Sequence, residues 1–263
     1  ISKIEITGLK LGKVTDIDTG IATLKDPLYF IDTATGGNGY LTKWFGGKEY
    51  LVEEGITRPI VKVSDLMSEE DLNHNTRRII FPYVWGERKL IPEDELANNF
   101  PRTFEYLSAI RKELEKRDKG KRSYEAWYAY GRTQGLNKFV EKILNPTFSA
   151  KPRFILCRRK DLLFCNGYSI SLPSTGQETF GDYPYRGEHG LELIWKILNS
   201  CVMDYYMRKT SYVIEGGFYC YQKQFTENFS LPELSEHEAS ELLAERDQVK
   251  IDRFLIRKYD LEL

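Results

Sequence analysis

The chain has 263 residues, of which 41% are hydrophobic and 29% are charged. These proportions are typical of a folded globular protein and exclude a disordered or collagen-like chain. No stretch approaches the roughly 18 apolar residues of a membrane helix, and the start lacks a signal-peptide pattern, so we expect a cytoplasmic protein with no membrane partner. Because the sequence opens on Ile1 rather than Met and stops at Leu263, we expect a fragment of a longer protein.

The formal net charge of -1 conceals an uneven distribution. Residues 102–160 contain 16 Lys and Arg against 6 Asp and Glu, a local charge of +10, so the remainder carries -11. Concentrated positive charge attracts polyanions. We therefore expect one face of the protein to bind nucleic acid.

The predicted elements define an α+β fold with a strand-rich N-terminal lobe, a mixed central recognition region and C-terminal helices. Residues 1–66 are rich in Thr, Ile, Val and Tyr and open in a strand-like pattern. Turn signals punctuate them, and the four residues from Gly36 to Gly39 are interpreted as a hairpin turn. A further strand is predicted over residues 78–84. A helix is predicted from Pro101 to Asp118, with apolar residues at helical spacing.

The later part of the chain is predicted to contain strands followed by helices. Strands are predicted over residues 142–144, 154–157 and 168–172. After Gly187, the apolar series from Leu191 to Tyr205 predicts one long helix. A last helix begins near Ser235, which forms a capping-box pattern with Glu238. We expect three segments within one fragment: residues 1–95, 96–232 and 233–263.

The most informative stretch runs from residue 117 to 137, where a basic turn stands beside aromatic residues. Five cations at its start can face phosphates: Lys116, Arg117, Lys119, Lys121 and Arg122. We predict phosphate contacts for three of them, Lys119, Lys121 and Arg122. The alternative is a solvated loop, because runs of charge usually form solvated faces.

A glycine-flanked turn follows, with Arg132, Thr133 and Gln134 between Gly131 and Gly135. Arg and Gln side chains hydrogen-bond base edges, so Arg132 and Gln134 are predicted to contact DNA bases, and Thr133 is predicted to bind DNA beside them. The alternative is a structural role in which Arg132 pairs with Asp118 or Glu125 and stacks on an aromatic ring.

Tyr130 is also predicted to contact DNA, through a base or the sugar-phosphate backbone. If residues 126–130 form a strand, Tyr128 and Tyr130 share one face while Trp127 points to the other. Core packing of Tyr130 is the alternative.

The sequence contains few motifs typical of catalysis or metal binding, and we predict no catalytic residue and no metal site in this chain. The cysteines show no C-x-x-C spacing, so we expect buried free thiols at Cys157, Cys165, Cys201 and Cys220. The pairs Glu53-Glu54 and Glu69-Glu70 are interpreted as parts of solvated loops. The alternative function is an autonomous metal-dependent nuclease that uses such carboxylates.

Six pieces, in order between Gly20 and Pro232, resemble the C-terminal specificity domain of adenine-specific DNA methyltransferases. They are GIATLKDPLYFI, RPIVKVSDL, RIIFPY, YLSAIRKELEKRDKGK, WYAYGRTQGL and ILNSCVMDYYMRKTSYVIEGGFYCYQKQF. The relevant group is the TaqI-like, Eco57I-like enzymes of restriction-modification systems. The resemblance implies that an N-terminal catalytic domain of the same polypeptide binds S-adenosylmethionine and methylates adenine N6. This chain would select the sequence on double-stranded DNA, hold no cofactor and be inactive alone.

The resemblance bears on two further segments. Asn145-Pro146-Thr147-Phe148 is close to the family's catalytic motif, but Thr replaces the second Pro and no glycine-rich cofactor turn precedes it, so we assign it no catalytic role. Residues 209–224 resemble the family's closing loop. From them we predict DNA contacts by Lys209, Gln222 and Lys223, with pinning of the last helix as the alternative. Weaker candidates lie near the start of the chain: Thr23, Lys25 and Lys43.

Overall fold

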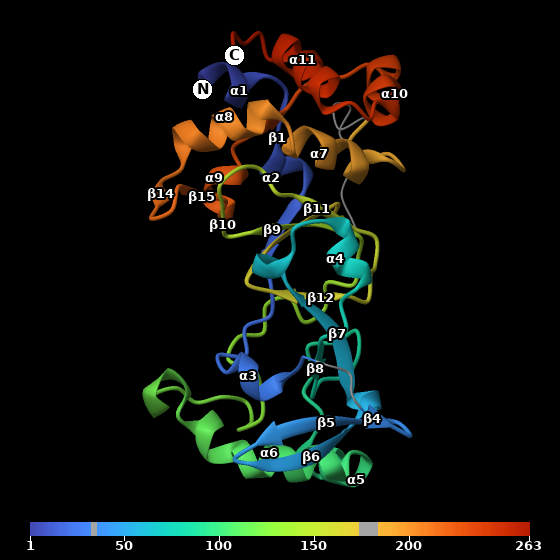
Figure 1. Cartoon of the computed structure of the whole chain (residues 1–263), viewed down its shortest axis with the longest axis vertical. Coiled ribbons are helices and arrows are strands. Elements are labelled where there is room, and N and C mark those ends of the chain that lie inside the picture. The colour runs from blue at the N-terminus through green and yellow to red at the C-terminus, as the bar shows by residue number, and fades with distance from the viewer. Residues whose placement is uncertain (33–35, 174–183) are drawn as a thin grey trace.

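The buried apolar side chains gather in three clusters that follow one another along an elongated molecule (Figure 1). The computed structural model describes residues 1–32, 36–173 and 184–263. Helices and small sheets alternate along it, so the α+β prediction is confirmed. None of the helices in these ranges combines the length and the apolar character needed to cross a membrane.

The first cluster joins the two ends of the chain, which lie close together at one end of the molecule (Figure 1). Strand β1 pairs with β16, which places Leu9 opposite Leu231. The chain opens in helix α1, so the predicted strand-like start is wrong. The elements around this cluster are α1 (Ser2–Ile6), β1 (Leu9–Lys10), α2 (Leu11–Val14), α7 (Gly190–Leu198), α8 (Cys201–Thr210), α9 (Lys223–Thr226), β16 (Ser230–Leu231), α10 (Glu236–Ala244) and α11 (Gln248–Lys258).

Two antiparallel sheets connect to this helical end. One has the strand order β11-β9-β13-β2, and the other has the order β10-β15-β14. Their strands are β2 (Asp16–Thr19), β9 (Lys142–Pro146), β10 (Phe148–Ser149), β11 (Ile155–Cys157), β13 (Gly167–Ser171), β14 (Val213–Ile214) and β15 (Phe218–Cys220). The three strands predicted within residues 142–172 are therefore confirmed as β9, β11 and β13.

Two further sheets, of order β12-β7-β8-β3 and β4-β5-β6, extend from the middle of the molecule to its opposite end (Figure 1). Asn38 and Gly39 have φ of +57° and +82° in the turn between β4 and β5, which confirms the predicted hairpin. The strands are β3 (Phe30–Ile31), β4 (Gly36–Gly37), β5 (Tyr40–Phe45), β6 (Lys48–Glu53), β7 (Thr57–Lys62), β8 (Arg78–Ile80) and β12 (Leu163–Cys165). The helices and helical turns are α3 (Asp26–Tyr29), η1 (Glu54–Ile56), η2 (Val63–Asp65), α4 (Glu69–Asn73), α5 (Glu93–Asn99), α6 (Pro101–Glu115) and η3 (Arg117–Gly120).

The apolar clusters group the chain differently from the three segments predicted by sequence. Residues 4–17 pack with the C-terminal helices, whereas residues 21–136 form most of the cluster at the other end. A small third cluster of β7, β9, β11 and β12 side chains lies between them. Three of the four cysteines are buried and Cys201 is half-buried, all as free thiols, and burial raises the pKa of the Cys165 thiol to about 12.

The long helix predicted after Gly187 is two helices, α7 and α8. The hydroxyl of Ser200 accepts a hydrogen bond from the Met203 amide, and the carboxylate of Asp252 accepts one from the Cys201 amide at 3.0 Å. These acceptors satisfy the free amides of a new helix start, so the chain breaks there although its apolar spacing continues. The capping box of Ser235 and Glu238 is confirmed at the start of α10, but a second C-terminal helix, α11, follows it.

Helix α6 begins against the β5–β6 hairpin, which lies across it (Figure 1). The Glu53 carboxylate accepts hydrogen bonds from the amides of Arg102 and Thr103, at 2.9 and 2.8 Å, and from the Thr103 hydroxyl. It therefore satisfies donors at the first turn of α6, where a negative charge is also favoured by the helix dipole. The prediction that Glu53 belongs to a solvated loop is wrong.

We expect Glu53→Gln to lower the free energy of unfolding by about 1 kcal/mol, because it removes the charged acceptor at the start of α6. Urea unfolding followed by circular dichroism measures this change. Glu49→Gln is the matched control, since Glu49 is exposed on the same strand. Equal stability of the two variants would contradict a capping role for Glu53.

Candidate nucleic-acid interface

The candidate interface is organised by a buried arginine at the end of α6. Arg117 is 2% exposed, and its guanidinium donates to the backbone carbonyls of Leu114 at 2.8 Å and Trp127 at 2.8 Å. It also donates to the carbonyls of Ala129 and Thr23, and it lies 4.4 Å from the centre of the Tyr124 ring. The prediction that Arg117 faces phosphates is therefore wrong, because its donors are used inside the protein.

The inward position of Arg117 turns the next residues outward. Asp118, Lys119 and Gly120 have φ of +47°, +57° and +69°, a left-handed turn that L residues adopt only at a cost. This turn presents Lys119, Lys121 and Arg122 to solvent. None of the three forms an ion pair with a residue that the structure describes.

Most of the cations in residues 102–160 are buried or ion-paired within the protein and are not free to bind DNA. Arg117 and Lys142 are buried, Arg153 is half-buried, and seven cations are ion-paired: Arg102, Arg111, Lys116, Arg132, Lys138, Arg158 and Arg159. Within the described ranges six remain exposed without an ion pair: Lys112, Lys119, Lys121, Arg122, Lys151 and Lys160. Half of these lie in the four residues from 119 to 122. The predicted attraction for polyanions is thus concentrated at this turn rather than spread over the whole segment.

The aromatic residues after the basic turn belong to the core. Residues 126–130 form turns rather than the strand on which the alternating faces were predicted. Tyr130 is 2% exposed, its hydroxyl donates to the Ile80 carbonyl at 2.5 Å, and its amide donates to the Tyr83 hydroxyl. We therefore replace the predicted DNA contact of Tyr130 with a packing role.

The glycine-flanked turn is fixed by its backbone. The amides of Gly131 and Arg132 donate to the carbonyls of Thr23 and Ala22, at 3.2 and 3.0 Å. A Cβ at Gly131 would lie 2.3 Å from the Leu24 side chain, so only glycine fits there. Directly after these two fixed residues, the side chains of Thr133 and Gln134 are exposed to solvent.

Arg132 is held lightly in place. Its guanidinium lies 3.4 Å from the Asp118 carboxylate and donates to the Gly131 carbonyl at 2.9 Å. The pKa of Asp118 is lowered by a hydrogen bond from the Tyr124 hydroxyl and by Arg132. The predicted alternative, a pair with Asp118, is therefore present. Such partly exposed pairs contribute only about 0–1 kcal/mol, so Arg132 can exchange this partner for another acceptor.

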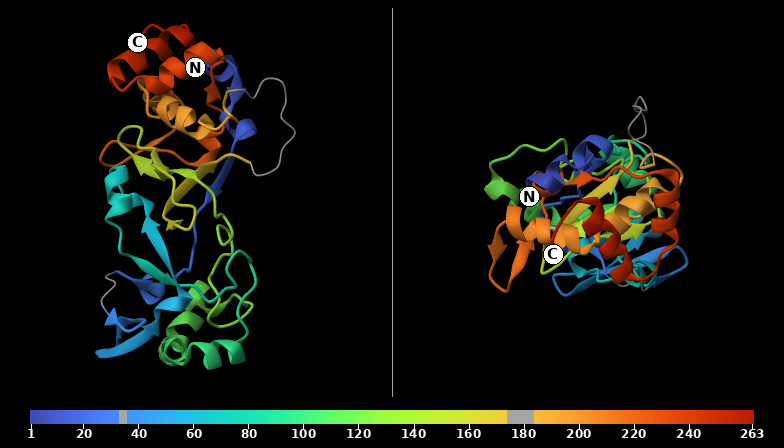
Figure 2. Two further views of the ribbon diagram at one scale, coloured as in Figure 1. Left: turned by 90° about the vertical axis from the view of Figure 1, so that its right-hand side faces the viewer. Right: turned by 90° about the horizontal axis from the view of Figure 1, so that it is seen from above.

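The second predicted cluster lies elsewhere on the same side of the molecule. Lys209, at the end of α8, and Lys223, at the start of α9, are exposed, whereas Gln222 is half-buried. The β14–β15 hairpin beside them and the η3 turn project to the left both in Figure 1 and in the view from above in Figure 2. The structure thus places the two predicted groups at separate points along one side.

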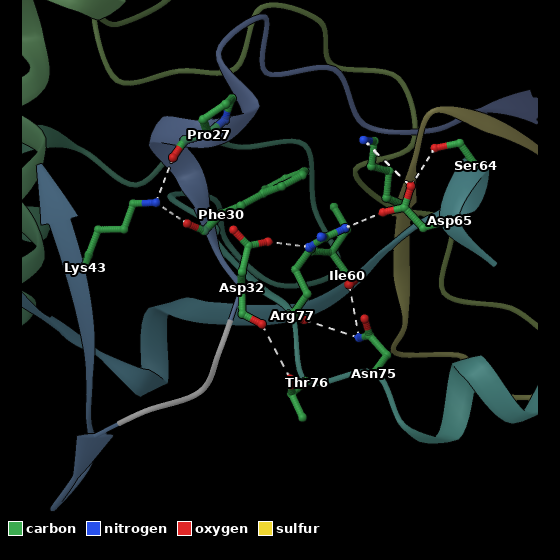
Figure 3. A network of polar contacts seen from close by, with 11 residues as sticks. Pro27, Phe30, Asp32, Lys43, Ile60, Ser64, Asp65, Asn75, Thr76 and Arg77 are labelled. Carbon is green, nitrogen blue, oxygen red and sulfur yellow. Dashed lines mark hydrogen bonds and ion pairs between the residues drawn. The ribbon is translucent and has the colours of Figure 1, made fainter.

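Two of the three weaker candidates near the start, Thr23 and Lys43, are used internally, whereas Lys25 is half-buried. Thr23 is fully buried and its hydroxyl donates to Asp26. Lys43 donates to the Pro27 carbonyl at 2.7 Å and to the Phe30 carbonyl (Figure 3), and burial lowers its pKa. The same view shows Arg77 between Asp32 and Asp65, at 2.7 and 3.3 Å. These polar groups join α3 and β8 to the neighbouring turns rather than forming an open surface.

No candidate catalytic site emerges among residues 1–32, 36–173 and 184–263. In these ranges no group of three or more His, Cys, Asp or Glu side chains is arranged to hold a metal ion. Asn145 is buried, and its amide donates to the carbonyls of Tyr221 and Pro146. Glu69 and Glu70 open α4, next to a capping box formed by Ser68 and Asp71.

The sequence contained a signal for the role of Arg117 that its charge concealed. Leu107, Ile110 and Leu114 form the buried stripe of α6, and Arg117 follows at the next position of the same helical spacing. A cation on an apolar stripe has to satisfy its donors inside the protein. Helical spacing therefore separates Arg117 from the exposed cations that follow it.

We expect Arg117→Met to lower the free energy of unfolding by about 3 kcal/mol, because it leaves buried carbonyls without donors. Arg122→Met is the control, and its effect should stay within about 0.5 kcal/mol, since Arg122 is exposed. Urea unfolding of both variants is the measurement. Similar losses in the two variants would show that the carbonyl contacts of Arg117 do not stabilise the fold.

Comparison with known proteins adds two similarities. No protein-family model matches the chain. The type II restriction enzyme and methyltransferase RM.Eco57I of Escherichia coli is 32% identical to it over 149 residues, covering 51% of this chain and 14% of that protein. The type IIL restriction-modification enzyme MmeI, solved in complex with DNA, shares its fold with a TM-score of 0.58 at 12% identity, over 97% of this chain and 34% of that one. The chain therefore spans only a small part of the length of either protein.

Proposed function

We propose that this chain is the DNA-recognition part of a restriction-modification enzyme. Two neighbouring features carry the proposal. Residues 119–122 contain three exposed cations without an ion pair among the described residues, and the next turn, fixed by backbone hydrogen bonds, presents Arg132, Thr133 and Gln134. The likeness to RM.Eco57I and the shared fold with MmeI support it.

The two parts of this surface suit different parts of a DNA duplex. Lys119, Lys121 and Arg122 have no carboxylate partner to displace, so they can neutralise phosphates and release counterions. Such contacts give affinity and orientation but no sequence preference. Arg132 and Gln134 carry the donors and acceptors that distinguish base edges, and their fixed backbone lowers the entropy lost on binding.

The finer part of the proposal concerns the enzyme to which this chain belongs. We propose that an N-terminal catalytic domain of the same polypeptide holds S-adenosylmethionine and methylates adenine at N6. The name of RM.Eco57I and the small share of it that this chain covers support this division. Double-stranded DNA and that domain are then the two partners of this chain.

We expect Lys119, Lys121 and Arg122, changed together to Ala, to weaken DNA binding and to reduce its salt dependence. Each lost phosphate contact lowers the slope of log K against log salt concentration by about 0.9, so the slope should fall by about 3. Fluorescence anisotropy with a labelled duplex, titrated at several salt concentrations, measures it.

The control is a triple variant of equal charge at other exposed lysines that are unpaired in the described structure, Lys89, Lys112 and Lys160. It should retain most of the slope. If the two triple variants lose the same amount, or if neither changes, binding is not localised at residues 119–122 and the proposed interface is incorrect.

We expect Gln134→Ala or Arg132→Ala to remove the preference for a particular base at one position, by about tenfold, since a good bidentate base contact contributes about 1–3 kcal/mol of discrimination. Selection of bound duplexes from a randomised pool measures this preference. Lys121→Ala is the control and should weaken all sequences alike. Unchanged preferences in both variants, with an unchanged melting temperature, would place sequence reading elsewhere.

A further inference from the structure

The β14–β15 hairpin exposes large apolar side chains at its tip. Tyr212, Val213, Ile214 and Phe218 are 47%, 54%, 39% and 42% exposed. They lie within seven residues of sequence, whereas single exposed apolar residues are common on any protein surface. Concentrated exposure of this kind marks a contact surface.

The register of the hairpin divides these side chains between two faces. Ile214 lies opposite Phe218, and Val213 lies opposite Tyr219. The Cys220 amide donates to the Tyr212 carbonyl, so Tyr212 continues the Ile214 and Phe218 face. Tyr219 on the other face is covered by Arg208, which lies 4.9 Å from the ring centre. Tyr212, Ile214 and Phe218 therefore share one face, and Ile214 and Phe218 form its open part, because the Tyr212 ring packs against Phe148 and Phe225. Val213, which is 54% exposed, adds apolar surface on the other face.

The tip is narrow and its base is rigid. Gly216 and Gly217, with φ of +87° and +78°, close the turn, and the Gly217 amide donates to the Ile214 carbonyl at 3.2 Å. At the other end, β15 pairs with β10, and Cys220 and Tyr221 are buried. Because the base of the hairpin is fixed, binding of the exposed side chains to a partner loses little conformational entropy.

The surroundings of the hairpin favour an anionic partner. Lys209 and Lys223 flank it in sequence and are exposed, and neither forms an ion pair with any residue that the structure describes. Glu215 at the turn is the one carboxylate of residues 209–224. The hairpin also projects to the same side as the basic η3 turn (Figures 1 and 2). Lysines beside an apolar tip suit DNA, whose phosphates border grooves through which apolar side chains can insert between stacked base pairs.

We infer that the β14–β15 hairpin is an apolar wedge that enters a groove of the DNA and places Ile214 and Phe218 against the bases, while Lys209 and Lys223 hold the flanking phosphates. This inference rests on the proposed DNA-recognition function. It adds a second contact region, away from the Arg132 turn, whose contribution is apolar rather than electrostatic. Apolar side chains inserted in this way unstack neighbouring base pairs.

Salt titration separates these two kinds of contact. Ile214→Ser combined with Phe218→Ser should weaken binding of the 263-residue chain to duplex DNA about tenfold at each salt concentration, because two buried apolar contacts are lost. The slope of log K against log salt concentration should stay unchanged, since neither side chain releases counterions. With 2-aminopurine placed along the duplex, the wild-type chain should raise its fluorescence by unstacking it, and the double variant should not.

Two further variants make the test specific. Leu51→Ser is the matched control, because Leu51 is 40% exposed on another hairpin. It should bind as the wild type does. Ile214→Lys should also weaken binding if the side chain lies against bases, whereas a tip that only passes near phosphates would bind more tightly with an added positive charge. This single change keeps the test valid if the double variant does not fold.

The outcomes distinguish this inference from the function on which it rests. If the wild-type chain binds DNA and the hairpin variants bind as Leu51→Ser does, the wedge is overturned and the DNA-recognition function stands. Loss of self-association in the hairpin variants, with unchanged DNA binding, would assign the hairpin to a protein contact and also overturn the wedge. Absence of DNA binding by the wild-type chain would overturn both proposals.

Discussion

The guanidinium of Arg117 is the interaction on which the candidate interface depends. It connects the last turn of α6 to the carbonyls of Thr23, Trp127 and Ala129, which belong to segments far apart in sequence. Burial of a charged group without partners is unfavourable, so these carbonyls have to converge on it. Their convergence fixes where the left-handed turn at residues 118–120 begins and where the chain enters the Gly131–Gly135 turn.

The protein separates cations that build the fold from cations that are free to bind. Lys43, Lys142 and Lys196, like Arg117, donate to backbone carbonyls. Burial lowers the pKa of all three lysines, because the charged form loses hydration that the carbonyls only partly replace. Exposed cations such as Lys119 and Lys121 have no such partners among the described residues. The net charge of a segment therefore predicts a binding surface less well than knowing which of its cations are buried or ion-paired and which are exposed.

The elongated arrangement gives the proposed contacts a spatial order. Both chain ends meet at the helical end, and the apolar cluster of residues 21–136 supports the basic turn at the other end (Figure 1). The β14–β15 hairpin and the η3 turn project from the two ends toward one side (Figure 2). Under the proposed function, phosphate contacts, base reading and an apolar wedge are then distributed along one side of the molecule.

The sequence by itself determined the elements whose causes are local. The apolar spacing of α6, the Asn38-Gly39 turn and the Ser235–Glu238 capping box depend on residues only a few positions apart, and all three predictions are confirmed. It also located the basic turn at which Lys119, Lys121 and Arg122 are exposed. Tertiary structure decided the rest: Tyr130 and Arg117 are buried, Glu53 caps a helix 50 residues away, and Asp252 caps the start of α8. Burial and hydrogen-bond partners depend on segments that folding brings together, and the spacing of residues along the sequence does not indicate which distant segments will be in contact.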